Sequence, residues 1–388
     1  MPLPARPIAS LLALILGLTA LLFVLPAAAQ QSTPARAAIV KDMLSGAILL
    51  EKNADEMLPP ASMSKLMTNM MVFEQLESGR LKLSDEFLIS ANAAALGGSR
   101  MFVRQGSRVS VENLLRGVVI QSGNDAAVAL AEAIAGTEAD FAKLMNRRAG
   151  ELGIENASFA NATGWPHPEH RISVRALSQI AERIITEFPN HYSLFSEREF
   201  TWDGITQRNR NPLLGNVEGA DGLKTGHTSE AGYGLVASAE RDGRRILLVV
   251  AGLESTAQRR QEAERLMNWA FRAFDTKVLQ RAGEAVVDAE TWTGAAPTVP
   301  LAPLEDVILT APLGDLDRAT VTARYEGPLP APIAAGDVLG EIEIAVPGLP
   351  PRRVPLVATE DVAPGGFFVR MEAAAELLIL RALALAGL

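Results

Sequence analysis

The sequence contains no cysteine among its 388 residues, which excludes disulfide bonds, thiol catalysis and cysteine-based metal sites. Histidine is also rare, with four in all. Two of these, His167 and His170, have a spacing that suits zinc on a helix, but Pro166 and Pro168 make this stretch a turn. We therefore expect neither a metal ion nor any other cofactor.

Positive charge is in deficit as well. Lys and Arg number 36 against 45 Asp and Glu, which gives a net charge of -9. Because no basic face is available for phosphate groups, nucleic acid is excluded as a partner. Apolar residues make up 48% of a chain that is longer than one ordinary domain, so we expect two domains with packed cores.

The first 29 residues have the three parts of a secretory signal peptide. Arg6 supplies the positive charge, residues 11–25 form an almost uninterrupted apolar run, and residues 27–29 are alanines suited to cleavage. The run is shorter than the roughly 20 residues that a membrane-spanning helix needs, and an uncleaved anchor is the alternative. We expect residues 1–29 to be removed on export, which places the mature protein in the periplasm.

A second apolar segment, residues 365–388, ends the sequence. Four charged residues interrupt it: Arg370, Glu372, Glu376 and Arg381. These charges disfavour a membrane-crossing helix but are compatible with a helix that lies in the membrane interface. We expect this helix to attach the protein to the outer face of the cytoplasmic (inner) membrane; a helix docked on its own protein is the alternative.

Residues 30–283 have the pattern of an α+β domain with an antiparallel sheet. Residues 38–52 and 233–252 each contain two apolar runs around a turn and predict β-hairpins. Helical periodicity covers residues 62–77, 111–152 and 258–274. Beyond residue 283 this periodicity ends, prolines become frequent, and short β-like runs alternate with turns. Residues 284–364 are therefore expected to form a small, separate β-sandwich.

Three short motifs contain the residue types that acyl transfer requires. Ser62 and Lys65 form an S-x-x-K motif. Ser122 and Asn124 belong to S-G-N, and Lys224 begins K-T-G on a strand-like stretch. Taken singly, each motif is common, and its ordinary interpretation is a helix cap, a turn or a strand end. Their joint occurrence in this order matches the set known from class A β-lactamases and penicillin-binding proteins.

The spacing of the first motif has a direct chemical meaning. Residues three apart on a helix share a face, so the amine of Lys65 can reach the hydroxyl of Ser62. A lysine accepts the serine proton only when burial or a second cation, for which Lys224 is the candidate, destabilises its ammonium form. Ser122 can relay a proton between the lysines and the leaving group. The start of a helix also lets the backbone N–H of Ser62 donate to an oxyanion.

The sequence resembles low-molecular-mass penicillin-binding proteins, the D-alanyl-D-alanine carboxypeptidases that trim peptidoglycan stem peptides. The similarity is dense around the first motif (LLEKNADEMLPPASMSKLMT) and the third (ADGLKTGHTSEAGYGLVASA), and it continues through residues 161–173 and 201–211. It extends into YEGPLPAPIAAGDVLGEIEI, which is similar to that family's C-terminal β domain. The resemblance implies a penicillin-binding transpeptidase fold, followed by the small all-β domain and the C-terminal helix.

The resemblance also implies roles for the matching residues. Ser62 is expected to be the acylated nucleophile, Lys65 its base and Ser122 a proton-transfer group. Asn124 is expected to bind the substrate amide, and Lys224 to assist electrostatically.

Further positions of the family's site also have counterparts. Thr225 is expected to line the site, and the backbone N–H of His227 to complete the oxyanion hole with that of Ser62. Arg210 is expected to bind the substrate carboxylate through a bidentate contact. A further arginine of the family corresponds to either Arg259 or Arg260.

The function that these roles imply is removal of the terminal D-alanine from peptidoglycan pentapeptides, with β-lactams as covalent inhibitors. A serine β-lactamase is the nearest alternative, although Glu169 does not lie in the pattern expected for a deacylating glutamate. The motifs are also compatible with a DD-endopeptidase and with a catalytically inactive wall-organising protein.

Overall fold

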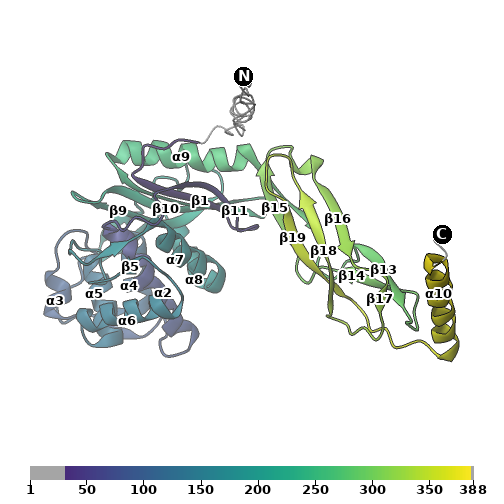
Figure 1. The fold of residues 1–388 in the computed structure, drawn as a ribbon. Helices are drawn as coiled ribbons and strands as arrows, with labels where there is room; N and C mark the ends of the chain where they lie inside the picture. Colours follow the sequence, from purple (N-terminus) through teal and green to yellow (C-terminus); the bar gives the residue numbers. More distant parts are fainter. Residues whose placement is uncertain (1–30, 386–388) are drawn as a thin grey trace, which may run out of the picture. The chain divides into compact units, whose positions relative to one another are not determined.

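The computed structural model describes residues 31–385, so the predicted signal peptide lies outside the described residues. A five-stranded antiparallel sheet, in the order β2-β1-β11-β10-β9, forms the framework of the N-terminal part (Figure 1). Its strands are β1 (Ala37–Asp42), β2 (Ile48–Lys52), β9 (Ala220–Thr228), β10 (Gly232–Arg241) and β11 (Arg244–Leu253). Both predicted hairpins, β1–β2 and β10–β11, are confirmed.

The sheet is covered on both faces, as Figure 1 shows. On β11, Leu247 and Val249 belong to the core shared with the helices of one face, whereas Leu248 and Val250 pack with α9 (Thr256–Ala273) on the other. Successive strand residues point to opposite faces, so a strand buried on both sides needs an uninterrupted apolar run. That requirement explains the sequence RRILLVVAGL of this strand.

Most helices lie on the face opposite α9. The expected helical stretch of residues 111–152 is divided into three helices, because Ser122-Gly123 and Gly136-Thr137 interrupt it. The Thr137 hydroxyl caps the third of them by accepting from the backbone N–H of Asp140, at 3.0 Å. The helices of this face include α2 (Lys65–Glu77), α4 (Val111–Val119), α5 (Asn124–Ala135), α6 (Glu138–Glu151), α7 (Val174–Glu187) and α8 (Pro189–Tyr192).

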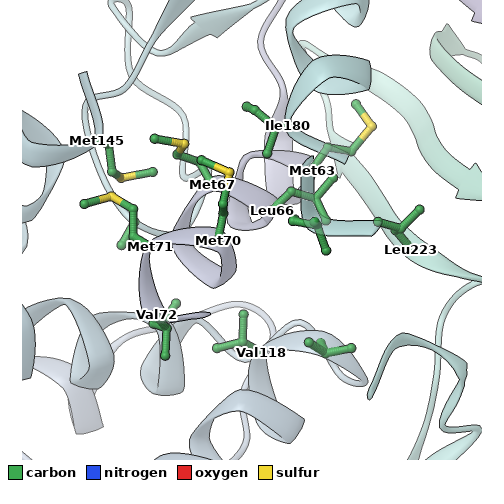
Figure 2. Close-up of a cluster of buried hydrophobic side chains, with 14 of the residues drawn as sticks. Met63, Leu66, Met67, Met70, Met71, Val72, Val118, Met145, Ile180 and Leu223 are labelled. Atoms are coloured by element: carbon green, nitrogen blue, oxygen red, sulfur yellow. The ribbon is translucent and has the colours of Figure 1, made fainter. Parts of the chain in front are cut away.

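Helix α2 is the centre of this packing. Every residue from Lys65 to Phe73 is buried, so the helix has no solvent-exposed stripe in its first nine positions. Figure 2 shows the methionines of its core, Met63, Met67, Met70, Met71 and Met145, which fill the space between α2 and its neighbours. Unbranched methionine side chains fit irregular gaps of this kind. Because α2 is enclosed on all sides, a side chain at its first turn is held in a fixed position.

Beyond residue 273 the chain forms sheets of its own. Strand β12 (Phe274–Gln280) pairs with β15 (Val307–Pro312), and six further strands form a sheet in the order β16-β18-β19-β14-β13-β17. The first of these strands therefore begins before the expected boundary at residue 284, because FDTKVLQ follows α9 directly with no turn residue between them. The other strands are β13 (Val287–Trp292), β14 (Thr298–Ala302), β16 (Thr320–Tyr325), β17 (Leu329–Pro330), β18 (Val338–Ala345) and β19 (Arg352–Ala358).

The predicted C-terminal helix is present as α10 (Phe367–Leu385). Several of its apolar side chains are exposed, among them Phe367, Phe368 and Leu378. Within residues 31–385 no helix combines the length and the hydropathy that crossing a membrane requires.

Candidate active site

The first motif lies where the chain passes from Pro60 into α2. Ser62 is in a short 3₁₀ turn, Ala61–Ser64, and Lys65 is the first residue of α2. The Nζ atom of Lys65 donates to the Oγ atom of Ser62 at 2.9 Å. The predicted contact between amine and hydroxyl is therefore confirmed.

Lys65 has no exposed surface, and three oxygen atoms surround its amine. Besides Ser62, they are the side-chain oxygen of Asn124 at 2.7 Å and the backbone oxygen of Thr163 at 2.5 Å. Burial, followed by the positive charge of Arg210, lowers the pKa of Lys65 from its ordinary value to about 7. A large fraction of this lysine is consequently uncharged near neutral pH and able to accept a proton.

Thr163 was not predicted as a site residue, because the residue types of its loop do not by themselves indicate a catalytic role. This loop approaches α2 closely because Gly164 has φ +79°, and a Cβ atom there would lie 1.9 Å from the backbone oxygen of Ala61. The side-chain oxygen of Asn161 accepts from the backbone N–H groups of Thr163 and Gly164, at 3.1 and 2.8 Å, which shapes the turn. The pair of an asparagine and a glycine three residues later is the sequence signal for this turn.

The second motif supplies one group to the cavity and one to the lysine. Ser122 lines the cavity in a left-handed conformation with φ +63°, and its buried hydroxyl has no hydrogen-bond partner within the described part of the chain. Asn124 is predicted to bind substrate, but both ends of its amide are engaged within the protein. Its oxygen accepts from Lys65, and its nitrogen donates to the backbone oxygen of Gly97 at 2.9 Å. In this structure Asn124 therefore orients the lysine.

The third motif lies on the edge strand β9, beside the turn that contains Ser62. A Cβ atom at Gly226 would come within 2.8 Å of the backbone oxygen of Pro60, so glycine permits the close approach of the strand. Thr225 and His227 line the cavity, and the ring of His227 stacks on Tyr233 with a centroid distance of 3.9 Å.

Lys224 is the predicted second cation near Lys65, and the structure buries both lysines where their charges influence each other. The Lys224 side chain is buried, and its amine donates to the backbone oxygen of Thr225 at 3.2 Å. Burial, and then the charge of Lys65, hold the pKa of Lys224 well below its usual range. Arg210, whose guanidinium group remains charged, is a further cation whose charge lowers the pKa of Lys65.

Arginine side chains form one wall of the cavity, which has a volume of 430 Å³. Arg210 donates to the hydroxyl of Ser99 at 2.5 Å, and Arg259 is 9% exposed with its guanidinium above the ring of Tyr233. Of the two candidate arginines, Arg259 is the one that lines the cavity, whereas Arg260 is exposed and pairs with Glu264. The lining residues are Ser62, Ser99, Ser122, Arg210, Thr225, Gly226, His227, Tyr233, Thr256 and Arg259.

These groups can carry out acyl transfer to a substrate that has a carboxylate. The serine hydroxyl is in contact with an amine that can accept its proton, and the two arginines are suited to an anionic end of the substrate. The fold and the site are those of a serine hydrolase in which a buried lysine contacts the serine hydroxyl. Residues 25–255 match the family model described as D-alanyl-D-alanine carboxypeptidase, and residues 274–364 match that of the C-terminal domain of penicillin-binding protein 5. The chain belongs to the D-alanyl-D-alanine carboxypeptidase family of serine peptidases.

Individual relatives agree with this assignment. The D-alanyl-D-alanine carboxypeptidase DacC of Escherichia coli is 38% identical over 348 residues, which are 88% of this chain and 87% of the relative. The crystal structure of penicillin-binding protein 5 from Haemophilus influenzae has a TM-score of 0.79 and 34% identity, and the match covers 86% of this chain and 98% of that one. Penicillin-binding protein D2 from Listeria monocytogenes, in its ampicillin-bound form, has a TM-score of 0.57 and 32% identity, with coverage of 62% and 98%.

Proposed function

We propose that the protein removes the terminal D-alanine from peptides that end in D-Ala-D-Ala, as peptidoglycan stem pentapeptides do, through an acyl-enzyme on Ser62. The observation that carries this proposal is the 2.9 Å contact between Ser62 Oγ and the buried amine of Lys65. Lys65 takes the hydroxyl proton while Ser62 attacks the carbonyl carbon of the penultimate D-alanine. The C–N bond then breaks, and D-alanine leaves as its amine receives a proton. Water hydrolyses the resulting ester and restores the serine.

The far wall of the cavity suits the end of such a peptide. Arg210 and Arg259 offer the terminal carboxylate charge-assisted hydrogen bonds, and the hydroxyl of Thr225 adds a neutral donor. The hydroxyl of Ser122, which has no hydrogen-bond partner among residues 31–385, lies in the same cavity and can pass a proton to the leaving amine. The backbone N–H groups of Ser62 and His227 are assigned to the oxyanion on the basis of family resemblance.

β-Lactams are expected to acylate Ser62 and to remain attached. The Listeria relative is described in an ampicillin-bound form, which supports β-lactam binding by this chain as well. Among the described residues that line this cavity there is no carboxylate, and Glu169 is exposed on its loop. Rapid hydrolysis of the penicilloyl ester by a glutamate-positioned water is therefore disfavoured, and with it a β-lactamase function.

The proposal is tested by incubating the purified chain with a D-Ala-D-Ala peptide and measuring free D-alanine. Wild type should release it, and Ser62→Ala should not. Ser64→Ala is the matched control, because Ser64 lies in the same turn but its hydroxyl donates to the backbone oxygen of Ala61, at 3.1 Å. D-Alanine release by Ser62→Ala would contradict the assignment. Penicillin labelling of wild type without any release would instead indicate an inactive penicillin-binding protein.

Two more assays distinguish a carboxypeptidase from a β-lactamase and from an endopeptidase. The lifetime of the penicilloyl adduct, followed by mass spectrometry, should exceed minutes for a carboxypeptidase and be short for a β-lactamase. Cross-linked muropeptide dimers should be cleaved much more slowly than pentapeptides, and comparable rates would favour an endopeptidase.

We also propose that the protein is exported to the periplasm and held at the outer face of the cytoplasmic membrane by α10. The support is the set of exposed apolar side chains on that helix, including Phe367, Phe368, Met371 and Ile379. Deleting residues 367–388 should release the protein from sedimenting membranes into the soluble fraction. Unchanged sedimentation would favour a retained N-terminal anchor, and a soluble full-length chain would favour a helix docked on its own protein.

A further inference from the structure

The side chain of Glu138, at the start of α6, contacts the loop that encloses Lys65 but has no part in the chemistry described above. It is partly buried, and its Oε1 atom accepts from the backbone N–H of Ala162 at 3.0 Å. Ala162 directly precedes Thr163, whose backbone oxygen accepts from the amine of Lys65. Glu138 is thus connected to the catalytic lysine through a single short segment of backbone.

This segment is supported from several elements. The hydroxyl of Thr68 on α2 donates to the backbone oxygen of Ala162 at 2.8 Å, while Gly164 lies against the turn that contains Ser62. Glu138 supplies the contact from α6. It is the only one of these partners with a full charge, and its carboxylate attracts the ammonium form of Lys65. A neutral acceptor would hold the backbone equally well, so the charge calls for a separate explanation.

We propose that Glu138 is a positioning residue for the Ser62–Lys65 pair, which fixes the Ala162–Thr163 backbone and balances the positive charge of Arg210 on the catalytic lysine. Arg210 alone favours an uncharged amine that is a weak base. The carboxylate of Glu138 opposes this effect and keeps the lysine basic enough to remove the serine proton. A general base is most effective when its pKa lies near the working pH, which is the balance that the two opposite charges produce.

Other charged groups surround the lysine. Asp125 of α5 also raises the pKa of Lys65. Its carboxylate has a structural role of its own, because it accepts hydrogen bonds from the backbone N–H groups of Met101 and Phe102. Lys224 of β9 is buried with a lowered pKa, and burial lowers the pKa of His170 to about 4, so that ring is neutral at neutral pH. Glu132 of α5 raises the pKa of Glu138 but is not among the groups that act on Lys65.

The ionisation of Glu138 is subject to two opposite influences. Burial raises the pKa of its carboxyl group, and the hydrogen bond from Ala162 together with the charge of Lys65 lowers it. The net shift of this pKa is upward, with burial as its largest cause, and the hydrogen bond from Ala162 and the charge of Lys65 are the two influences that favour the charged form. Removing this charge without removing the hydrogen bond isolates the electrostatic part of the role.

The test measures the rate of acylation by a fluorescent penicillin in single turnovers from pH 5 to 9. It rests on the proposed function only because acylation of Ser62 is the reaction that is measured. Glu138→Gln keeps an oxygen that can accept from Ala162 but loses the charge. It should move the acid limb of the pH–rate profile to lower pH by about half a unit or more, which is a roughly three-fold larger neutral fraction of Lys65 on the acid side. It should also lower the plateau, because a less basic lysine is a weaker general base. Glu138→Ala should lower the plateau further, because the hydrogen bond that holds the Ala162–Thr163 backbone is lost as well.

Glu132→Gln is the matched control, since it removes a neighbouring carboxylate whose oxygen accepts from Asn92 at 2.9 Å. Its acid limb should coincide with that of wild type. An unshifted limb in Glu138→Gln, or an equal shift in Glu132→Gln, would overturn the inference while leaving the acyl-enzyme intact. If Glu138→Gln does not fold, Glu138→Asp and Glu138→Asn repeat the comparison, because their side chains have the same shape and differ only in charge. Absence of any adduct in wild type would instead reject the proposed function.

Discussion

Replacing Gly164 by alanine tests whether the close approach of the 161–164 loop to α2 holds the catalytic lysine in place. Gly164 has φ +79°, a conformation that costs a residue with a Cβ about 1–2 kcal/mol. The added Cβ would also lie 1.9 Å from the backbone oxygen of Ala61. The two nearest atoms, O and C of Ala61, belong to the backbone, so a change of side-chain rotamer cannot relieve the clash with them. The loop must move away from the nucleophile by about 1 Å or more.

The magnitude has two parts. The left-handed conformation and the overpacking together cost about 3 kcal/mol, which lowers Tm by roughly 6–12 °C in a domain of this size. The same movement withdraws the oxygen of Thr163 from the amine of Lys65, now at 2.5 Å. A displacement of about 1 Å at a reacting group typically costs about 100-fold in rate. The rate of acylation should therefore fall by about two orders of magnitude.

Gly153→Ala separates the two parts. Gly153 also has positive φ, at +66°, but a Cβ there would meet no atom within 4 Å. Its Tm should fall by roughly 3–6 °C through conformation alone, with acylation unchanged. Thermal denaturation by circular dichroism and single-turnover penicillin labelling provide the two measurements. Equal losses of Tm in both variants, or normal acylation by Gly164→Ala, would refute the reasoning.

Three further predictions concern charged groups. Acylation by wild type should rise with pH through an acid limb near 7, because only the neutral amine of Lys65 accepts the serine proton and its pKa is lowered to about 7 by burial; stopped-flow rates that still rise above pH 9 would contradict this. Arg259→Gln should raise KM for a D-Ala-D-Ala peptide by roughly ten-fold or more, while Arg260→Gln should change it less than about two-fold, as steady-state kinetics would show. Asp125→Ala should lower the free energy of unfolding by about 2–3 kcal/mol in denaturant titrations, because the backbone N–H groups of Met101 and Phe102 lose their acceptor; an unchanged midpoint would speak against this.

Local sequence patterns were sufficient to predict the elements that depend on residues close together in the chain. The hairpin β10–β11 follows from two apolar runs around Asp242-Gly243, and the contact between Ser62 and Lys65 follows from their spacing. The divided helix of residues 111–152 was less evident, because alanine and leucine spacing continues across Ser122-Gly123 while the backbone at Ser122 turns to φ +63°. Such a break depends on a backbone conformation that the surrounding fold imposes on a residue other than glycine.

The order of the motifs and the residue types within them were enough to indicate a serine nucleophile, its lysine and the α+β class, since helical spacing and strand alternation are properties of short segments. The environment of the lysine depended on packing between segments far apart in the chain. Only the folded chain shows that Thr163 and Asn124 enclose the amine and that the charge of Arg210 lowers its pKa. The folded chain also shows that Arg259 rather than Arg260 reaches the cavity. Burial and the distance between charges determine a pKa, and both arise when distant segments meet.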